Sequence, residues 1–121
     1  MKIDWTPLQI ELAHWRANGL TLPFWWRDDD VIEPTAALDQ LLELGAEFDC
    51  PVHLAVIPNG ANAALADRLS SDRFAIPLTH GWAHTSHARE GQKKAEFGTS
   101  RPMADIRSDL ENGRDRMHEI F

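Results

Sequence analysis

The chain alternates between apolar runs and segments with helical periodicity. Three runs have the length and residue types of strands: 20–26, 51–57 and 74–78. Apolar residues recur at helical spacing in segments that begin at four points: Thr6, Pro34, Ala63 and Pro102. Thr6 is expected to cap the first helix, with proline in its first turn and Gly19 at its end. Because strands alternate with helices, the sequence predicts an α/β fold with a parallel sheet buried on both faces.

The remaining segments define how the chain is organised. Residues 1–121 are expected to form a single domain, with a leading helix over 1–19. The polar stretch 81–99 is predicted to be a loop. Gly113 is expected to weaken the last helix. Phe121 ends this helix without a stop signal, so we expect the natural chain to continue.

Composition and charge exclude some classes of partner. The formal net charge of −7 argues against general attraction to nucleic acid or to anionic membranes. A single cysteine, Cys50, cannot form an internal disulfide. Met1 to Trp5 run straight into an amphipathic segment, so we expect no leader peptide, and no apolar run approaches the roughly 20 residues that cross a bilayer. The sequence therefore predicts a cytoplasmic protein.

Clustered carboxylates and a pair of histidines follow two of the predicted strands. Asp28-Asp29-Asp30 comes after the first strand, and His80 and His84 come after the third. The carboxyl ends of parallel strands open on one rim of the sheet, where active sites gather. Carboxylate with two imidazoles suits zinc and leaves coordination positions open. Taken separately, the aspartates read as a solvated loop and the histidines as surface residues.

Other residues near these motifs have weaker claims to a functional role. Gly81 stands where a zincin helix needs its glutamate, so the His80–His84 pair brings no general base. His87 could add a third imidazole, although an exposed or supporting role fits it better. Three tryptophans flank the predicted site and suit packing or stacking on a sugar: Trp25, Trp26 and Trp82.

Two segments, Trp26-Arg27-Asp28-Asp29-Asp30 and His80-Gly81-Trp82-Ala83-His84, resemble the motifs of the polysaccharide deacetylase (NodB-homology) family. The resemblance implies that 20–121 are strand–helix units of a distorted, seven-stranded (β/α) barrel, of which this chain holds only the N-terminal part. It implies Asp28 as catalytic base and Asp29, His80 and His84 as metal ligands. A register shifted by one residue would make Asp29 the base and Asp30 the ligand. The sequence departs from the family pattern by having Asp30 in a glycine place and Gly81 in a hydroxyl place.

The resemblance also implies a reaction, a metal-dependent hydrolysis that removes an N-acyl group, such as acetyl, from a carbohydrate-like substrate. The family's base-orienting arginine and its general acid would lie beyond Phe121, which leaves turnover by this chain alone open. Two other interpretations remain. The same scaffold could hydrolyse a C–N bond in a small cyclic amide, or the chain could be a non-catalytic fragment that binds sugar or self-associates through an open sheet edge.

Overall fold

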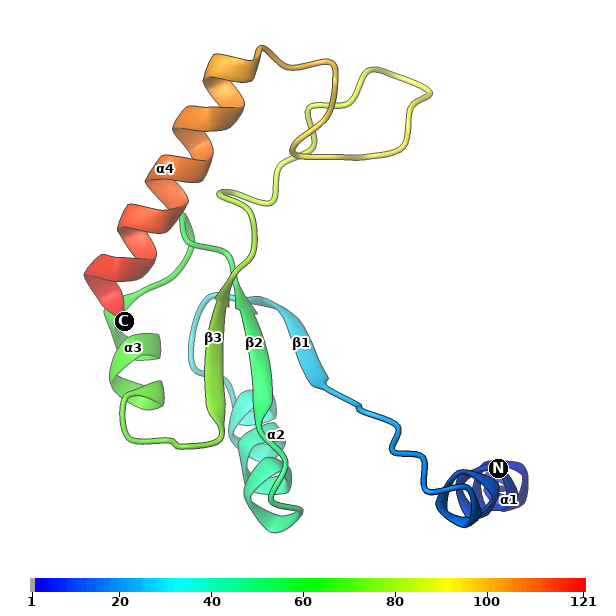
Figure 1. Cartoon of the computed structure of the whole chain (residues 1–121). Coiled ribbons are helices and arrows are strands. Elements are labelled where there is room, and N and C mark those ends of the chain that lie inside the picture. Colours follow the sequence, from blue (N-terminus) through cyan, green and yellow to red (C-terminus); the bar gives the residue numbers. More distant parts are fainter. Residues whose placement is uncertain (1) are drawn as a thin grey trace.

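The computed structural model describes residues 2–121 as a three-stranded parallel sheet whose strands alternate with helices (Figure 1). The elements, in chain order, are α1 (Thr6–Ala17), β1 (Trp26–Val31), α2 (Ala36–Glu47), β2 (Val52–Val56), α3 (Ala63–Leu69), β3 (Ala75–Thr79) and α4 (Met103–Ile120). This confirms the predicted α/β class and the parallel sheet. Residues 80–102 form the predicted loop.

The core lies on one face of the sheet. β2 is the central strand, and its alternate residues Val52, Leu54 and Val56 are fully buried. They pack against Leu42 of α2 and Leu65 of α3. Side chains on alternate positions of a strand share one face, so this row defines the side that the helices cover. Met117 and Ile120 of α4 are partly buried and pack against the same core.

The opposite face of the sheet is only partly covered. Arg27, His53 and Ile76 lie in register across the three strands, and their side chains are half-buried or exposed. The expectation of a sheet buried on both faces is therefore wrong for the residues described. The apolar run of β2 misled the prediction, because its residues on this face are the small Ala55, which is 1% exposed, and the half-buried His53.

The first strand begins later than predicted. Pairing with β2 starts at Trp26 and continues to Val31, which reaches the core with 8% exposure. Phe24 and Trp25, which suggested a strand over 20–26, are 77% and 59% exposed. Aromatic composition gave the wrong bounds, because strand position depends on pairing more than on propensity. The three aspartates consequently lie within β1 rather than after it.

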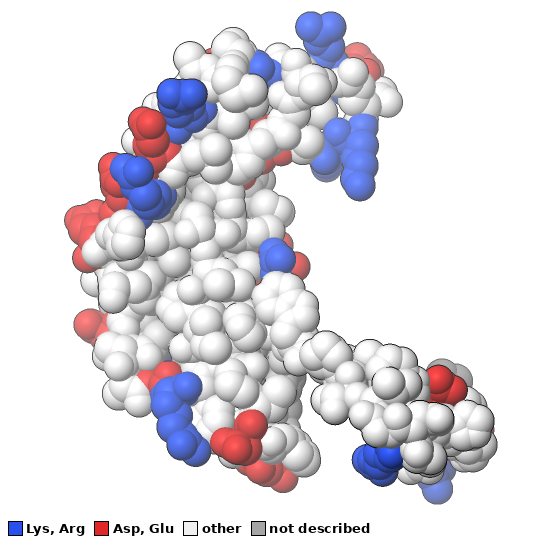
Figure 2. Space-filling view, viewed as in Figure 1, with Lys and Arg blue, Asp and Glu red and all other residues white. Residues whose placement is uncertain are grey.

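The leading helix α1 stands apart from the sheet, joined to it by an extended segment (Figure 1 and Figure 2). None of its residues is buried. Trp5, rather than Thr6, is its N-cap residue and makes no side-chain capping bond, while the Asp4 carboxylate accepts a hydrogen bond from the Thr6 amide at 3.0 Å. The expected single domain over 1–121 stays a prediction.

Gly113 allows α4 to approach the loop that follows β3. The residue is buried, and a β-carbon built there would lie 2.9 Å from the Gly81 carbonyl oxygen and 3.6 Å from Pro58. A contact below 3.0 Å with a backbone atom requires a shift of the loop or the helix. The sequence suggested a weak point in the helix, whereas the structure gives this glycine a packing role.

We predict that Gly113→Ala destabilises the fold although alanine favours helices. Helix propensity alone would raise the free energy of unfolding by about 1 kcal/mol. Overpacking against the Gly81 carbonyl costs about 1–3 kcal/mol and should outweigh that gain. Urea unfolding measures the difference, and Ser108→Ala on the exposed face of α4 is the matched control, with a small gain expected. A stability gain for Gly113→Ala would contradict the close packing.

Candidate metal centre

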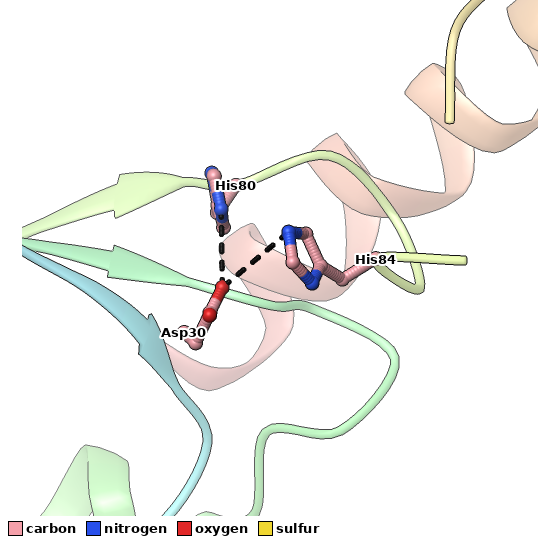
Figure 3. Close-up of side chains that lie close together, drawn as sticks. All are labelled: Asp30, His80 and His84. Atoms are coloured by element: carbon pink, nitrogen blue, oxygen red, sulfur yellow. Dashed lines mark ion pairs between the residues drawn. The ribbon is translucent and has the colours of Figure 1, made fainter. Parts of the chain in front are cut away.

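Asp30, His80 and His84 meet at the rim of the sheet (Figure 3). Oδ1 of Asp30 lies 3.2 Å from Nε2 of His80 and 3.5 Å from Nε2 of His84. The two imidazole rings are 4.9 Å apart and tilted by 31°. One carboxylate oxygen therefore faces two ring nitrogens, brought from β1 and from the loop after β3.

The spacing of these atoms fits a small divalent cation. One ligand atom from each residue can be chosen so that all lie within 4.8 Å of one another. Zinc–nitrogen and zinc–oxygen bonds of about 2.0–2.1 Å at tetrahedral angles place ligand atoms about 3.3 Å apart. The two separations between Asp30 and the imidazoles, 3.2 and 3.5 Å, bracket that value. Three protein ligands would leave a fourth position open, as in catalytic zinc sites.

A bulge in β1 aims Asp30 at the histidines. Asp28 pairs with Leu54, but the next pair joins Val31 to Val56, so β1 carries one extra residue. Asp30 has a φ of 64°, in the left-handed region that aspartate tolerates better than most residues. Bulges commonly redirect side chains beside functional sites. Here the extra residue lets Asp30 face the rim while Val31 returns to the core.

The other two aspartates point elsewhere. Oδ1 of Asp29 accepts a hydrogen bond from Nε of Arg27 at 2.7 Å. Asp28 is in register with Leu54, which places it on the helix-covered side of the sheet, and it is half-buried. The structure thus differs from the preferred alignment, in which Asp28 was the base and Asp29 the ligand. It favours the register shifted by one residue, with Asp30 beside His80 and His84. The bulge that causes this difference depends on pairing with β2, so it could not be predicted from the sequence.

Arg27 links the site to Asp29. Its Nη2 lies 3.3 Å from Nδ1 of His80, and its guanidinium stands 5.9 Å from the Trp25 ring centre. Since arginine only donates, this contact requires an unprotonated Nδ1 and leaves the ring proton on Nε2, facing Asp30. A cation bound at Nε2 requires the other tautomer. Metal binding would therefore break the contact between Arg27 and His80, while the hydrogen bond from Arg27 to Asp29 can remain.

Glu96 supports the turn between the two histidines. Its Oε1 accepts a hydrogen bond from the Ala83 amide at 2.7 Å, and both carboxylate oxygens lie 3.3 Å from the Trp82 amide. Gly81 has a φ of 65°, and a β-carbon there would overlap Oε2 of Glu96. The glycine that departs from the family pattern is thus required by this turn. Sequence reasoning missed Glu96 because it lies in a polar loop with no regular spacing.

The remaining aromatic and histidine candidates lie outside the triad. His87 is exposed and does not belong to the cluster of possible ligands. Trp26 packs against the core, and Trp82 is half-buried. Trp25 is exposed and meets the His53 ring edge-on, with ring centres 5.0 Å apart. Of the three tryptophans, Trp25 offers the most accessible surface for stacking.

Comparisons with protein-family models, with curated proteins and with solved structures found no match for this chain. Within residues 2–121, no helix combines the length and hydrophobicity required to cross a membrane.

We predict that Gly81→Ala costs more stability than Gly91→Ala. Both glycines have positive φ, but a β-carbon at Gly91 meets no atom within 4 Å. Each change incurs the left-handed penalty of roughly 1–2 kcal/mol. Gly81→Ala should also displace Glu96 and lose hydrogen bonds worth about 1 kcal/mol or more. Urea unfolding of the metal-free proteins compares the two, and equal costs would show that the Glu96 contact contributes nothing.

Proposed function

We propose that the chain binds a divalent cation, zinc by preference, through Asp30, His80 and His84, and that it belongs to a hydrolase of N-acyl groups on carbohydrate-like substrates. The observation that carries the proposal is the position of one Asp30 oxygen, 3.2 and 3.5 Å from the two imidazole Nε2 atoms. A lone carboxylate could satisfy two protonated histidines as well, so metal content is the deciding measurement.

The neighbouring residues suit the hydrolysis of an acyl group. Zinc bound at such a site supplies a Lewis acid for the acyl carbonyl and lowers the pKa of water. Asp29 is 57% exposed and is held by Arg27, so its second oxygen is free to take a proton from an attacking water. Asp28 faces the helix-covered side and is a poorer base. Arg27 would keep its hydrogen bond to Asp29 when the metal releases His80, so it would hold the proposed base in the loaded site.

We also propose that the sheet is part of a larger (β/α) barrel. The strand order is sequential, β1-β2-β3, and the core packs residues of α2, α3 and α4 against one face of the sheet. That arrangement is typical of barrels, in which helices surround a sheet whose other face turns inward. Arg27 and His53 on the uncovered face would then line the barrel interior beside the site.

A non-catalytic role is the second candidate. Phe24 and Trp25 are among the most exposed apolar residues, at 77% and 59%, and lie close in sequence to the site. Exposed aromatic faces stack on sugar rings. β1 and β3 are both edge strands, so self-association through an open edge is a further possibility for this chain.

Asp30→Asn should abolish tight zinc binding, and Asp29→Asn should weaken it far less. Loss of a direct ligand is expected to weaken binding by more than about 100-fold, whereas loss of a supporting group costs about 10–100-fold at most. Isothermal titration with zinc, using a competing chelator, measures both variants against the wild type. The reverse order of effects would restore Asp29 as the ligand.

The zinc-loaded protein is expected to release acetate from N-acetylated chito-oligosaccharides. A chelator should stop the release and added zinc should restore it. Asp29→Asn should keep zinc and lose about 10²–10⁴-fold in rate, the usual contribution of a general base. The assay includes a cyclic amide such as a hydantoin as the competing substrate.

The outcomes separate the candidate functions. Cleavage of the cyclic amide alone would assign the site to the other class of C–N hydrolase. Full zinc occupancy without turnover, together with quenching of tryptophan fluorescence by the sugar, would favour the binding role. Absence of stoichiometric zinc in the wild type would rule out every metal-dependent reading.

A further inference from the structure

We propose that Glu96 is a positioning residue for the metal centre, which holds the 80–84 turn so that His84 faces Asp30. The inference rests on the proposed metal site, and it assigns a role to a residue that the motifs do not include. Glu96 touches neither Asp30 nor the imidazoles by any hydrogen bond in the structure. Its effect is therefore transmitted through the backbone of the turn.

The turn presents consecutive amides to a single anion. With Gly81 at a φ of 65°, the amides of Trp82 and Ala83 both point at the Glu96 carboxylate, at distances of 3.3 and 2.7 Å. Successive amides arranged in this way form a concavity that binds anions. Hydrogen bonds to an ionised carboxylate are about twice as strong as neutral ones. The anion here is part of the chain, supplied from 13 residues beyond Ala83.

Glu96 is itself anchored to the body of the protein. Nη1 of Arg101 contacts the Glu96 carbonyl oxygen at 3.5 Å and binds Asp109 of α4 at 2.7 Å. The side chains of Arg101 and Asp109 are only 12% and 18% exposed. On the far side of the turn, the Asn59 amide donates to the Trp82 carbonyl at 2.9 Å. The turn is thus held by both Asn59 and Glu96, and the Glu96 bond lies at the residue before His84.

The two histidines depend on this contact to different degrees. His80 follows β3 directly, and its amide donates to the Val56 carbonyl at 2.7 Å, so the sheet places it. His84 lies at the far end of the turn, has a φ of 53° and a side chain that is 52% exposed. The bond from Glu96 to the Ala83 amide is the shorter of the two described hydrogen bonds at the residues that flank His84, since Oγ1 of Thr85 donates to the Ala83 carbonyl at 3.4 Å, within the turn itself. Loss of Glu96 should therefore act mainly through His84.

The test compares zinc affinities of full-length variants by isothermal titration. Glu96→Gln replaces one accepting oxygen by an amide donor that faces the Trp82 amide, and zinc binding should weaken by about 10–100-fold. Glu96→Asp keeps the charge at shorter reach and should restore part of the affinity. Glu90→Gln is the matched control, because it makes the same charge change on the same loop, and it should leave zinc affinity unchanged.

A double-mutant cycle distinguishes positioning from general loss of structure. In a His84→Ala background the turn no longer carries the ligand that Glu96 is proposed to position, so adding Glu96→Gln should lower zinc affinity by less than about twofold. Thermal unfolding of the metal-free variants reports separately on the fold. If Glu96→Gln does not fold, Glu96→Asp is compared by the same cycle.

Several results would overturn the inference. Wild-type affinity in Glu96→Gln would show that the turn needs no such support. The full loss reappearing in the His84→Ala background would show that Glu96 acts on the fold or on His80 instead. In both cases zinc binding by the wild type would leave the metal site standing, whereas a wild type that binds no zinc would remove both proposals.

Discussion

One feature of the backbone controls the site, the conformation of β1 where it runs past β2. β1 has a single extra residue between Asp28 and Val31, and Asp30 has a left-handed φ. As a result, the adjacent residues Asp30 and Val31 can lie in different environments. Val31 fills the core while Asp30 faces the rim. A regular strand would alternate strictly, and a shift by one residue would exchange the core and rim positions. The conformation costs of order 1–3 kcal/mol, and such strain often lies at functional sites.

The histidine side of the site depends on close backbone packing. Gly113 lets α4 approach the Gly81 carbonyl, and Gly81 leaves room for the Glu96 carboxylate. Both glycines lack a side chain where a neighbouring atom occupies its space. The loop from 80 to 102 contains no regular secondary structure. It carries both histidines, and it packs against α4 through Gly81. Within residues 2–121, three residues other than glycine have a positive φ, and two of them, Asp30 and His84, belong to the triad.

The sequence predicted the alternation of strands and helices, the parallel sheet and the convergence of an acidic segment with two histidines. These features follow from local periodicity and from the rule that loops at one end of parallel strands share a rim. It did not predict which aspartate faces the histidines, because a bulge depends on pairing with another strand. Propensity placed the first strand at Leu20–Trp26, whereas pairing begins at Trp26. The contact of Glu96 with Ala83 joins residues that are 13 positions apart in a polar loop, and no periodicity in the sequence indicates it.

One ion held by Asp30 and two imidazoles should be visible by X-ray absorption spectroscopy of the zinc-loaded protein, because the fine structure reports the type and distance of the ligands. This arrangement predicts nitrogen and oxygen ligands at about 2.0–2.1 Å, outer-shell scattering from two imidazole rings, and no sulfur. A spectrum without imidazole scattering, or one dominated by a zinc–sulfur distance of about 2.3 Å, would contradict it.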